Sequence, residues 1–239
     1  PQGVREAVRH APGRVLDVYL TEAALERHSE IWDEAVAAGL YVHVTTQQVM
    51  DAMSPDAQGL LAVVATEEAT GSEALAAALE GARLVAVLTQ AQDPGNAGTI
   101  IRAADAAGAD AVVLVRGSVD PTAPKVVRST AGSLFHLPVV TGVALDDAVT
   151  ALHNAGLTVL AADGRGDFDL FEAESLLGAP SAWLLGNEAH GLPLEALSRA
   201  DAVVSIPIYG KAESLNVAAA AAVCLYASAR AQAQNSGRS

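Results

Sequence analysis

Short apolar runs alternate with longer amphipathic segments through most of the chain. The runs predict strands at residues 84–88, 111–115, 137–140, 157–161, 182–185 and 202–206. The amphipathic segments predict helices near 97–107, 122–130, 145–155, 193–199 and 216–232. Regular alternation of strand and helix is typical of a mostly parallel sheet with helices on both faces. We therefore expect an α/β fold for residues 83–239.

The first 65 residues have a pattern of their own. Helices are predicted at 4–10, 22–38 and 46–53, and strands at 15–20, 41–44 and 60–64. Residues 66–82 begin polar and continue as a short Ala/Leu-rich patch. The expected organisation is a small α/β domain at 1–65, a linker at 66–82 and a larger domain at 83–239.

Composition favours an ordered globular protein. The chain has 239 residues, of which 51% are hydrophobic, enough to bury a sizeable core. No apolar run approaches the roughly 20 residues that cross a bilayer, so no membrane partner is expected. The single cysteine, Cys224, has no partner for an intrachain disulfide, which favours a cytoplasmic protein.

The formal net charge of −14 argues against a general polyanion binder, because non-specific nucleic-acid affinity comes largely from Lys and Arg. A binding face nevertheless needs only a local basic cluster. Candidate contacts to nucleic acid lie in or near the loops discussed next: Arg102, Arg116, Lys125, Arg128 and Lys211.

Three segments place Gly, Asn, Glu and Ser at predicted strand-to-helix turns. They are DPGNAGTIIR (93–102), LLGNEAHGLP (184–193) and IPIYGKAESLNVAAAAAV (206–223). Because the carboxyl ends of parallel strands meet at one edge of a sheet, these polar residues should gather there. The sequence thus predicts one site built from three loops.

Single residues in these loops also have ordinary structural interpretations. Asn96 suits a cap for a helix that begins near Ala97, and Ser214 alone would suit the cap of the long helix that follows. Glu188 alone could be an exposed turn acid. Arg102, however, is the only cation on a short, otherwise apolar helix, which favours a role in binding.

Several familiar motifs are missing. No GxGxxG follows a strand, and neither GxxxxGK[ST] nor GxSxG occurs. The six histidines, at 10, 28, 43, 136, 153 and 190, are scattered, and no Cys/His spacing suits zinc. We therefore expect no metal and no standard dinucleotide or phosphate-loop site.

In order and spacing, the three loops resemble the signature motifs of the SpoU-type RNA methyltransferases of the SPOUT class. The resemblance covers residues 84–232 and rests on Asn96 with Arg102, on Gly186-Asn187-Glu188 and on Ser214-Leu215-Asn216. Residues 1–64, ending in Gln58-Gly59-Leu60, are similar to the small RNA substrate-binding domain that many members carry in front. Ala57 stands where the family usually has histidine.

The resemblance implies an α/β fold with a C-terminal trefoil knot, a homodimer, and methyl transfer from S-adenosylmethionine to a ribose 2′-oxygen. It implies that the cofactor is held by Ala161, Ala162, Asp163, Gly164, Leu185, Gly186, Asn187, Ile206, Ile208, Ser214, Leu215, Asn216 and Ala218. The implied catalytic residues are Asn96, Arg102, Glu188, Ser214 and Asn216. A guanidinium is a poor base, so Arg102 is expected to lower the hydroxyl pKa and anchor a phosphate.

The roles implied for the other catalytic residues are structural as much as chemical. Asn96 would fix Arg102 or the ribose, Glu188 would orient its loop and a cation, and Ser214 and Asn216 would order the cofactor loop and the incoming nucleotide. The front domain favours 23S ribosomal RNA as substrate. A tRNA 2′-O-methyltransferase, a catalytically idle RNA-binding or assembly module, and an α/β enzyme acting on a small metabolite remain alternatives.

Overall fold

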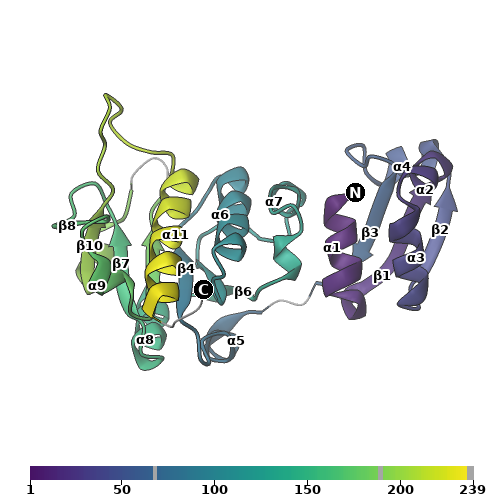
Figure 1. Cartoon of the computed structure of the whole chain (residues 1–239). Coiled ribbons are helices and arrows are strands. Elements are labelled where there is room, and N and C mark those ends of the chain that lie inside the picture. The colour runs from purple at the N-terminus through teal and green to yellow at the C-terminus, as the bar shows by residue number, and fades with distance from the viewer. Residues whose placement is uncertain (67–68, 188–190, 236–239) are drawn as a thin grey trace. The chain divides into compact units, whose positions relative to one another are not determined.

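The computed structural model describes residues 1–66, 69–187 and 191–235, which form two compact units (Figure 1). The first unit is Pro1–Glu67 with Ala131–His136, and the second is Glu68–Thr130 with Leu137–Ser239. A short segment from the middle of the chain thus belongs with the N-terminal residues. Apolar periodicity could not indicate this, because the segment joins the first core mainly through one side chain, Phe135.

The first unit is a small α/β structure. Its elements are α1 (Gln2–His10), β1 (Val15–Thr21), α2 (Glu22–Arg27), α3 (Ser29–Ala37), β2 (Tyr41–Thr45), α4 (Gln47–Met53) and β3 (Leu60–Val64), with single 3-10 turns at Pro12–Arg14 and Ser133–Phe135. The sheet order is β2-β1-β3, with β1 parallel to β2 and antiparallel to β3. Val18, Leu20, Ile31 and Ala35 are fully buried in its core.

The single helix predicted at 22–38 is two helices. Thr21 caps α2 through its side chain, which accepts a hydrogen bond from the Ala24 amide at 3.2 Å. The chain then leaves the helical region at His28, with φ −136° and ψ 42°, and α3 begins at the next residue. Both helices are amphipathic, so the apolar pattern continues across a break that only the backbone at His28 reveals.

The second unit contains a seven-stranded sheet. Its strands are β4 (Leu84–Leu88), β5 (Ala111–Val115), β6 (Val139–Val143), β7 (Thr158–Ala162), β8 (Phe168–Asp169), β9 (Ser181–Leu185) and β10 (Ala202–Ser205). Its helices are α5 (Gly71–Ala78), α6 (Pro94–Ala106), α7 (Pro124–Ser129), α8 (Leu145–Asn154), α9 (Glu174–Leu177), α10 (Leu194–Arg199) and α11 (Val217–Asn235). The order is β6-β5-β4-β9-β7-β10-β8, and every pair is parallel. The α/β prediction is confirmed.

Helices cover both faces of this sheet (Figure 1). Residues of α6, α9 and α11 share one core with the sheet, whereas residues of α5, α8 and α10 share the other. The long helix α11 packs against α6, β4 and β9. Trp183 on β9 donates its indole N–H to the Ser228 hydroxyl of α11 at 2.9 Å, and both side chains are fully buried. This contact fixes the helix that leads away from the third loop.

The prediction of a linker at 66–82 was wrong for most of that segment. The Ala/Leu-rich patch forms α5, which packs on β6 and α8 and buries Leu75 and Leu79. The spacing of those leucines already matches one helix face. The short elements β8 and α9 were not predicted at all, because neither is long enough to show a period.

Among the residues that the structure describes, no helix combines the length and the apolar character needed to cross a membrane. The trefoil knot implied by the resemblance stays a prediction.

Candidate functional site

The strand order of the second unit reverses beside β4. From β4 the chain moves outward through β5 and β6, then returns to place β7 and β9 on the other side of β4. In open α/β sheets, ligands bind outside the carboxyl ends of the strands at such a switch point. The loops after β4, β9, β7 and β10 all start at this edge.

A cavity of about 530 Å³ lies at this edge. The residues predicted to hold a cofactor that line it are Ala162, Asp163, Gly164, Gly186, Asn187, Ile206, Ile208, Ser214, Leu215 and Asn216. Three other residues predicted to hold the cofactor do not line the cavity: Ala161, Leu185 and Ala218. Each is buried and is next in the chain to a residue that does line it. Five further residues that were not predicted also line the cavity: Gly191, Val204, Glu213, Val217 and Ala220.

The loop after β9 requires glycine at its first position. A Cβ at Gly186 would lie 2.5 Å from the Gly191 carbonyl carbon and 2.6 Å from the Leu192 nitrogen. Two backbone hydrogen bonds between Asn187 and Gly191, at 3.0 and 2.9 Å, hold the two ends of the loop together. This close approach shapes one wall of the cavity. Glu188, predicted to be catalytic, lies outside the described residues.

The loop after β4 is tied to the loop after β9. Thr89 donates both its backbone N–H and its hydroxyl to the Leu185 carbonyl, each at 2.9 Å. The Asn187 side chain donates to the Gln90 carbonyl at 3.0 Å. Gln90 has a φ of 56°, a left-handed conformation that is uncommon for residues other than glycine. The segment that leads from β4 into the first predicted loop is therefore joined to the second predicted loop by specific hydrogen bonds.

Asn96 does not cap α6, contrary to prediction. The helix begins at Pro94, and Asp93 caps it by accepting a hydrogen bond from the Asn96 backbone N–H at 2.8 Å. Proline at the first helical position and aspartate at the cap are both favoured choices. Asn96 is thus inside the first turn, which leaves its side chain available for another contact.

That contact is with the third loop. The Asn216 amide group donates to the Asn96 side-chain oxygen at 3.2 Å. The other end of the Asn216 amide accepts from the backbone N–H groups of Ala218 and Ala219, at 2.9 and 3.3 Å. Asn216, rather than Ser214, therefore caps α11, while Ser214 is exposed at the cavity. One asparagine links the first loop, the third loop and the start of α11.

An ion pair lies beside the cavity. Arg165 donates to the two carboxylate oxygens of Asp163 at 2.9 and 3.1 Å, and its backbone N–H donates at 3.0 Å. The hydrogen bonds from Arg165 hold the pKa of the Asp163 carboxyl below its usual range. Asp163 was predicted from the resemblance, but Arg165 was not predicted, since nothing in its local pattern distinguishes it from other exposed cations.

The basic residues predicted to bind RNA fall in three places. Gly98 of α6 packs so tightly on α7 that a Cβ there would lie 2.5 Å from the Ser129 Cβ. Arg102 is one turn further on the same face of α6, next to the helix that carries exposed Lys125 and Arg128. Separately, Arg116 donates to the Gly142 carbonyl at 3.2 Å, and Lys211 is exposed in the third loop.

Residues 83–226 match the model of the SpoU rRNA Methylase family. The chain belongs to this family. It is 42% identical over 151 residues to the 23S rRNA (guanosine(2553)-2′-O)-methyltransferase RlmP of Bacillus subtilis, a match that covers 62% of the chain and 58% of that relative. It is 29% identical over 227 residues to the 23S rRNA (guanosine-2′-O-)-methyltransferase RlmB of Bordetella pertussis, covering 93% of the chain and 92% of the relative.

Solved structures of the SpoU family extend the likeness to both units. The structure of AviRb from Streptomyces viridochromogenes in complex with AdoMet is 28% identical, with a TM-score of 0.80 over 98% of this chain and 89% of that one. An AdoMet-bound rRNA methyltransferase from Sinorhizobium meliloti is 29% identical, with a TM-score of 0.78 over 96% of this chain and 85% of that one.

Proposed function

We propose that this SpoU-family protein transfers a methyl group from S-adenosylmethionine to a ribose 2′-hydroxyl of RNA, with 23S ribosomal RNA as the substrate. The observation that carries the proposal is the cavity at the switch point, which the segments after β7, β9 and β10 build together. The relatives named for 23S rRNA 2′-O-methylation, and the AdoMet-bound neighbours, support the same conclusion.

The residues at the cavity fit this cofactor. The volume of about 530 Å³ lies in the range of about 300–1,000 Å³ that is usual for ligands of this size. Gly164 and Gly186 leave backbone groups open to a ligand, while Ile206, Ile208 and Leu215 offer apolar contacts. Asp163 and Glu213 carry negative charge at the wall, which complements the net positive charge of a sulfonium amino acid.

The chain's own residues have to align the ribose and assist the loss of one proton. When bound, the cofactor supplies an electrophilic methyl group. Arg102 lowers the pKa of the 2′-hydroxyl electrostatically, because a guanidinium stays protonated and cannot serve as the base. The hydroxyl proton would be lost to water or to a neighbouring group. The contact between Asn96 and Asn216 holds α6, and with it Arg102, in a fixed place relative to the third loop.

RNA binding would use local basic residues in spite of the net charge of −14. Arg102, Lys125 and Arg128 lie on the adjoining helices α6 and α7, where a phosphate backbone can follow them. Glu188, Arg116 and Lys211 remain part of the proposal as further contacts to the loop or the RNA.

The first unit would recognise the substrate. Tyr19 stacks on His43 with ring centroids 4.8 Å apart, across paired positions of β1 and β2. Tyr41, two residues before His43 and thus on the same face of the sheet, has 75% of its surface exposed. Such aromatic rings on an open sheet are suited to stacking with unpaired bases.

Ribosomal RNA is favoured over tRNA by the share of this chain that aligns with structures of each kind of enzyme. A structure titled for 2-OH methylation of C/U34 on tRNA aligns with 65% of this chain, at 33% identity and a TM-score of 0.57. The rRNA methyltransferase from Sinorhizobium meliloti aligns with 96%. The presence of Arg102 and Asn216 also disfavours the idle binding module.

Dimerisation and a cytoplasmic location are part of the same proposal. Several large side chains of the second unit are exposed around the third loop and α11, among them Tyr209 at 87% and Tyr226 at 53%. A second copy of the chain would cover them. Light scattering coupled to gel filtration should give twice the monomer mass, and a monomer at every concentration would contradict this part.

Calorimetric titration with S-adenosylmethionine, paired with methyl transfer to protein-free 23S rRNA, tests the main proposal. Arg102→Ala should keep cofactor affinity and lose methyl transfer by about 100-fold or more, since Arg102 acts on the ribose hydroxyl and the RNA rather than on the cofactor. Loss of cofactor binding in this variant, or unchanged transfer, would contradict the role given to Arg102. No cofactor binding by the unaltered protein would overturn the function.

The RNA surface has its own test. Replacing Lys125 and Arg128 together by alanine should make the plot of log affinity against log salt shallower by about 1.4–1.8 and leave cofactor affinity unchanged. Arg230→Ala is the matched control, because this exposed arginine lies about 20 Å along α11 from its first residue. Equal salt dependence in the double variant and the unaltered protein would remove these residues from the interface.

A further inference from the structure

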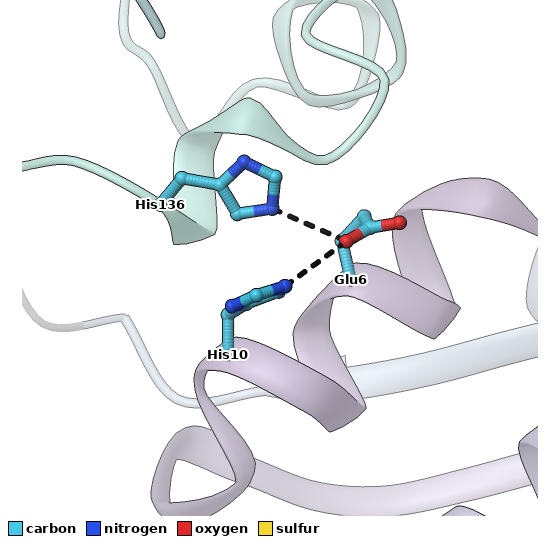
Figure 2. A group of neighbouring side chains, drawn as sticks. All are labelled: Glu6, His10 and His136. Atoms are coloured by element: carbon cyan, nitrogen blue, oxygen red, sulfur yellow. Dashed lines mark hydrogen bonds and ion pairs between the residues drawn. The ribbon is translucent and has the colours of Figure 1, made fainter. Parts of the chain in front are cut away.

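Two histidines and a glutamate converge within the first unit, well away in sequence from the three loops. Glu6 and His10 lie one turn apart on α1, and His136 ends the Ala131–His136 segment of the same unit (Figure 2). The Glu6 Oε2 atom lies 3.3 Å from His10 Nε2 and 3.2 Å from His136 Nε2. All three ligand atoms lie within 4.8 Å of one another.

We propose that Glu6, His10 and His136 bind a divalent transition-metal ion of the zinc type. Zinc bonds of about 2.0–2.2 Å to histidine nitrogen and carboxylate oxygen place neighbouring ligand atoms about 3.3–3.5 Å apart in a tetrahedron. The nitrogen–oxygen separations from Glu6 to His10 and to His136 match that edge to within about 0.1–0.2 Å. Imidazole with one carboxylate favours zinc over magnesium or calcium, which prefer all-oxygen sites.

The cluster is held in place by its surroundings. Gly132, with a φ of 105°, lies so close to the Glu6 side chain that a Cβ there would be 2.4 Å from its Cγ. Phe135 packs against the first core, and Arg14 lies over its ring at 5.8 Å from the centroid. Phe135, the residue before His136, is therefore fixed in place, which reduces the conformational entropy that His136 would lose on binding a metal.

Exposure leaves room for a fourth ligand. The Glu6 side chain is only 17% exposed, whereas the His136 and His10 side chains are 26% and 51% exposed. The two rings meet edge to face with centroids 4.5 Å apart. Both Nε2 atoms face the Glu6 carboxylate (Figure 2). Water could complete a three-ligand site of this kind. The ion would join the Ala131–His136 segment to α1 and so stabilise the first unit.

Direct metal binding by the full chain tests this proposal without reference to methyl transfer. The protein should be free of affinity tags, stripped with a chelator and titrated with Zn²⁺, with Mg²⁺ as the ion that should not bind. We expect one Zn²⁺ per chain and a raised unfolding midpoint when Zn²⁺ is added. Co²⁺ should give the visible absorption of a tetrahedral nitrogen and oxygen site. Burial raises the pKa of the Cys224 thiol to about 12, so this thiol should add no sulfur signal.

Single substitutions decide between this site and the scattered histidines elsewhere. His10→Gln, His136→Gln and Glu6→Gln should each weaken Zn²⁺ binding by at least about 10-fold, the cost of even indirect ligand changes. His43→Gln is the matched control, since His43 has a carboxylate partner, Asp17, at 2.8 Å but is in no cluster of three ligands among the described residues.

The expected pattern is loss in the three cluster variants and no change in His43→Gln. No stoichiometric binding by the unaltered protein would overturn the proposal and leave the contacts as hydrogen bonds only. Binding that survives both His10→Gln and His136→Gln would overturn it equally. Because His10 is half exposed, His10→Gln should fold normally even if His136→Gln does not, and circular dichroism checks both.

Discussion

The sheets of the two units are buried to very different degrees. β4, β5 and β9 of the second unit are buried at all five positions, whereas β2 of the first unit has no buried residue. A sheet covered on both faces can use only its edge for binding, so its site consists of backbone, glycines and loop ends. A sheet with an open face can display side chains, such as the rings of Tyr19 and His43, across its surface.

The largest effect should come from the buried sheet. Trp183→Ala removes a fully buried side chain and its hydrogen bond to Ser228, and should lower the free energy of unfolding of the second unit by about 3–5 kcal/mol. Urea unfolding followed by circular dichroism measures it. The one other tryptophan of the chain, Trp32, lies in the first unit, so its fluorescence in this variant reports that unit separately.

Tyr41→Ala is the control for Trp183→Ala. Tyr41 is a large aromatic residue in the open sheet, and we expect its removal to change stability by less than about 0.5 kcal/mol. Similar losses for both variants would contradict the distinction between the two sheets.

The second effect concerns backbone packing at the cavity. Gly186→Ala places a methyl group against backbone atoms of Gly191 and Leu192, which cannot move aside without opening the loop. Overpacking of about 1–3 kcal/mol corresponds to cofactor binding weaker by about 5- to 150-fold. Gly210→Ala, where a Cβ would meet nothing within 4 Å, should bind cofactor normally in the same titration.

The third effect separates the two roles of Asn216. Asn216→Ala should lower stability by about 1 kcal/mol, because α11 loses its cap. Asn216→Asp keeps an oxygen that can cap the helix but cannot donate to Asn96. We expect this variant to fold with nearly normal stability and to have slower methyl transfer. Normal transfer by Asn216→Asp would show that the contact with Asn96 does not position Arg102.

The smallest effect is a pH dependence at the cavity wall. The folded state lowers the Asp163 pKa, so the stabilisation is present above the unfolded-state pKa and is lost as pH falls through the folded-state pKa. Arg165→Ala should therefore be slightly less stable than the unaltered protein near neutral pH, and the difference should vanish in acid. Unfolding curves over a range of acidic pH values measure it.

Arg27→Ala is the control for Arg165→Ala, because the Arg27 side chain donates to the Ala23 carbonyl rather than to a carboxylate. Its effect on stability should not change with pH through the acid range. A constant difference between Arg165→Ala and the unaltered protein at all pH values would contradict the link to Asp163.

Much of the second unit could be predicted from apolar runs alone. The predicted strands 84–88 and 111–115 have the observed bounds, since each is a continuous apolar segment between turn residues. Predictions from the apolar pattern were wrong where a helix was short or broken. The segment of α5 was taken for a linker, and α2 and α3 were taken for one helix. A local pattern shows which face is apolar but not what the segment packs against.

The candidate site was predictable as a set of loops but not as a set of contacts. Sequence placed Asn96 and Asn216 in the same site, yet assigned the caps of α6 and α11 to the wrong residues. It gave no sign of the pair formed by Asp163 and Arg165. Capping by Asp93 or by Asn96 would leave the same sequence pattern, and only the backbone geometry distinguishes them.

The sequence by itself determined the class of fold, the order of its longer strands and helices and the three loops, because these follow from period and turn chemistry along the chain. Only the tertiary structure decided which side chains meet across long separations. Asn96 reaches Asn216, and Glu6 with His10 reaches His136, more than a hundred residues away. Such contacts depend on the order of strands and the packing of helices, which short-range periodicity does not encode.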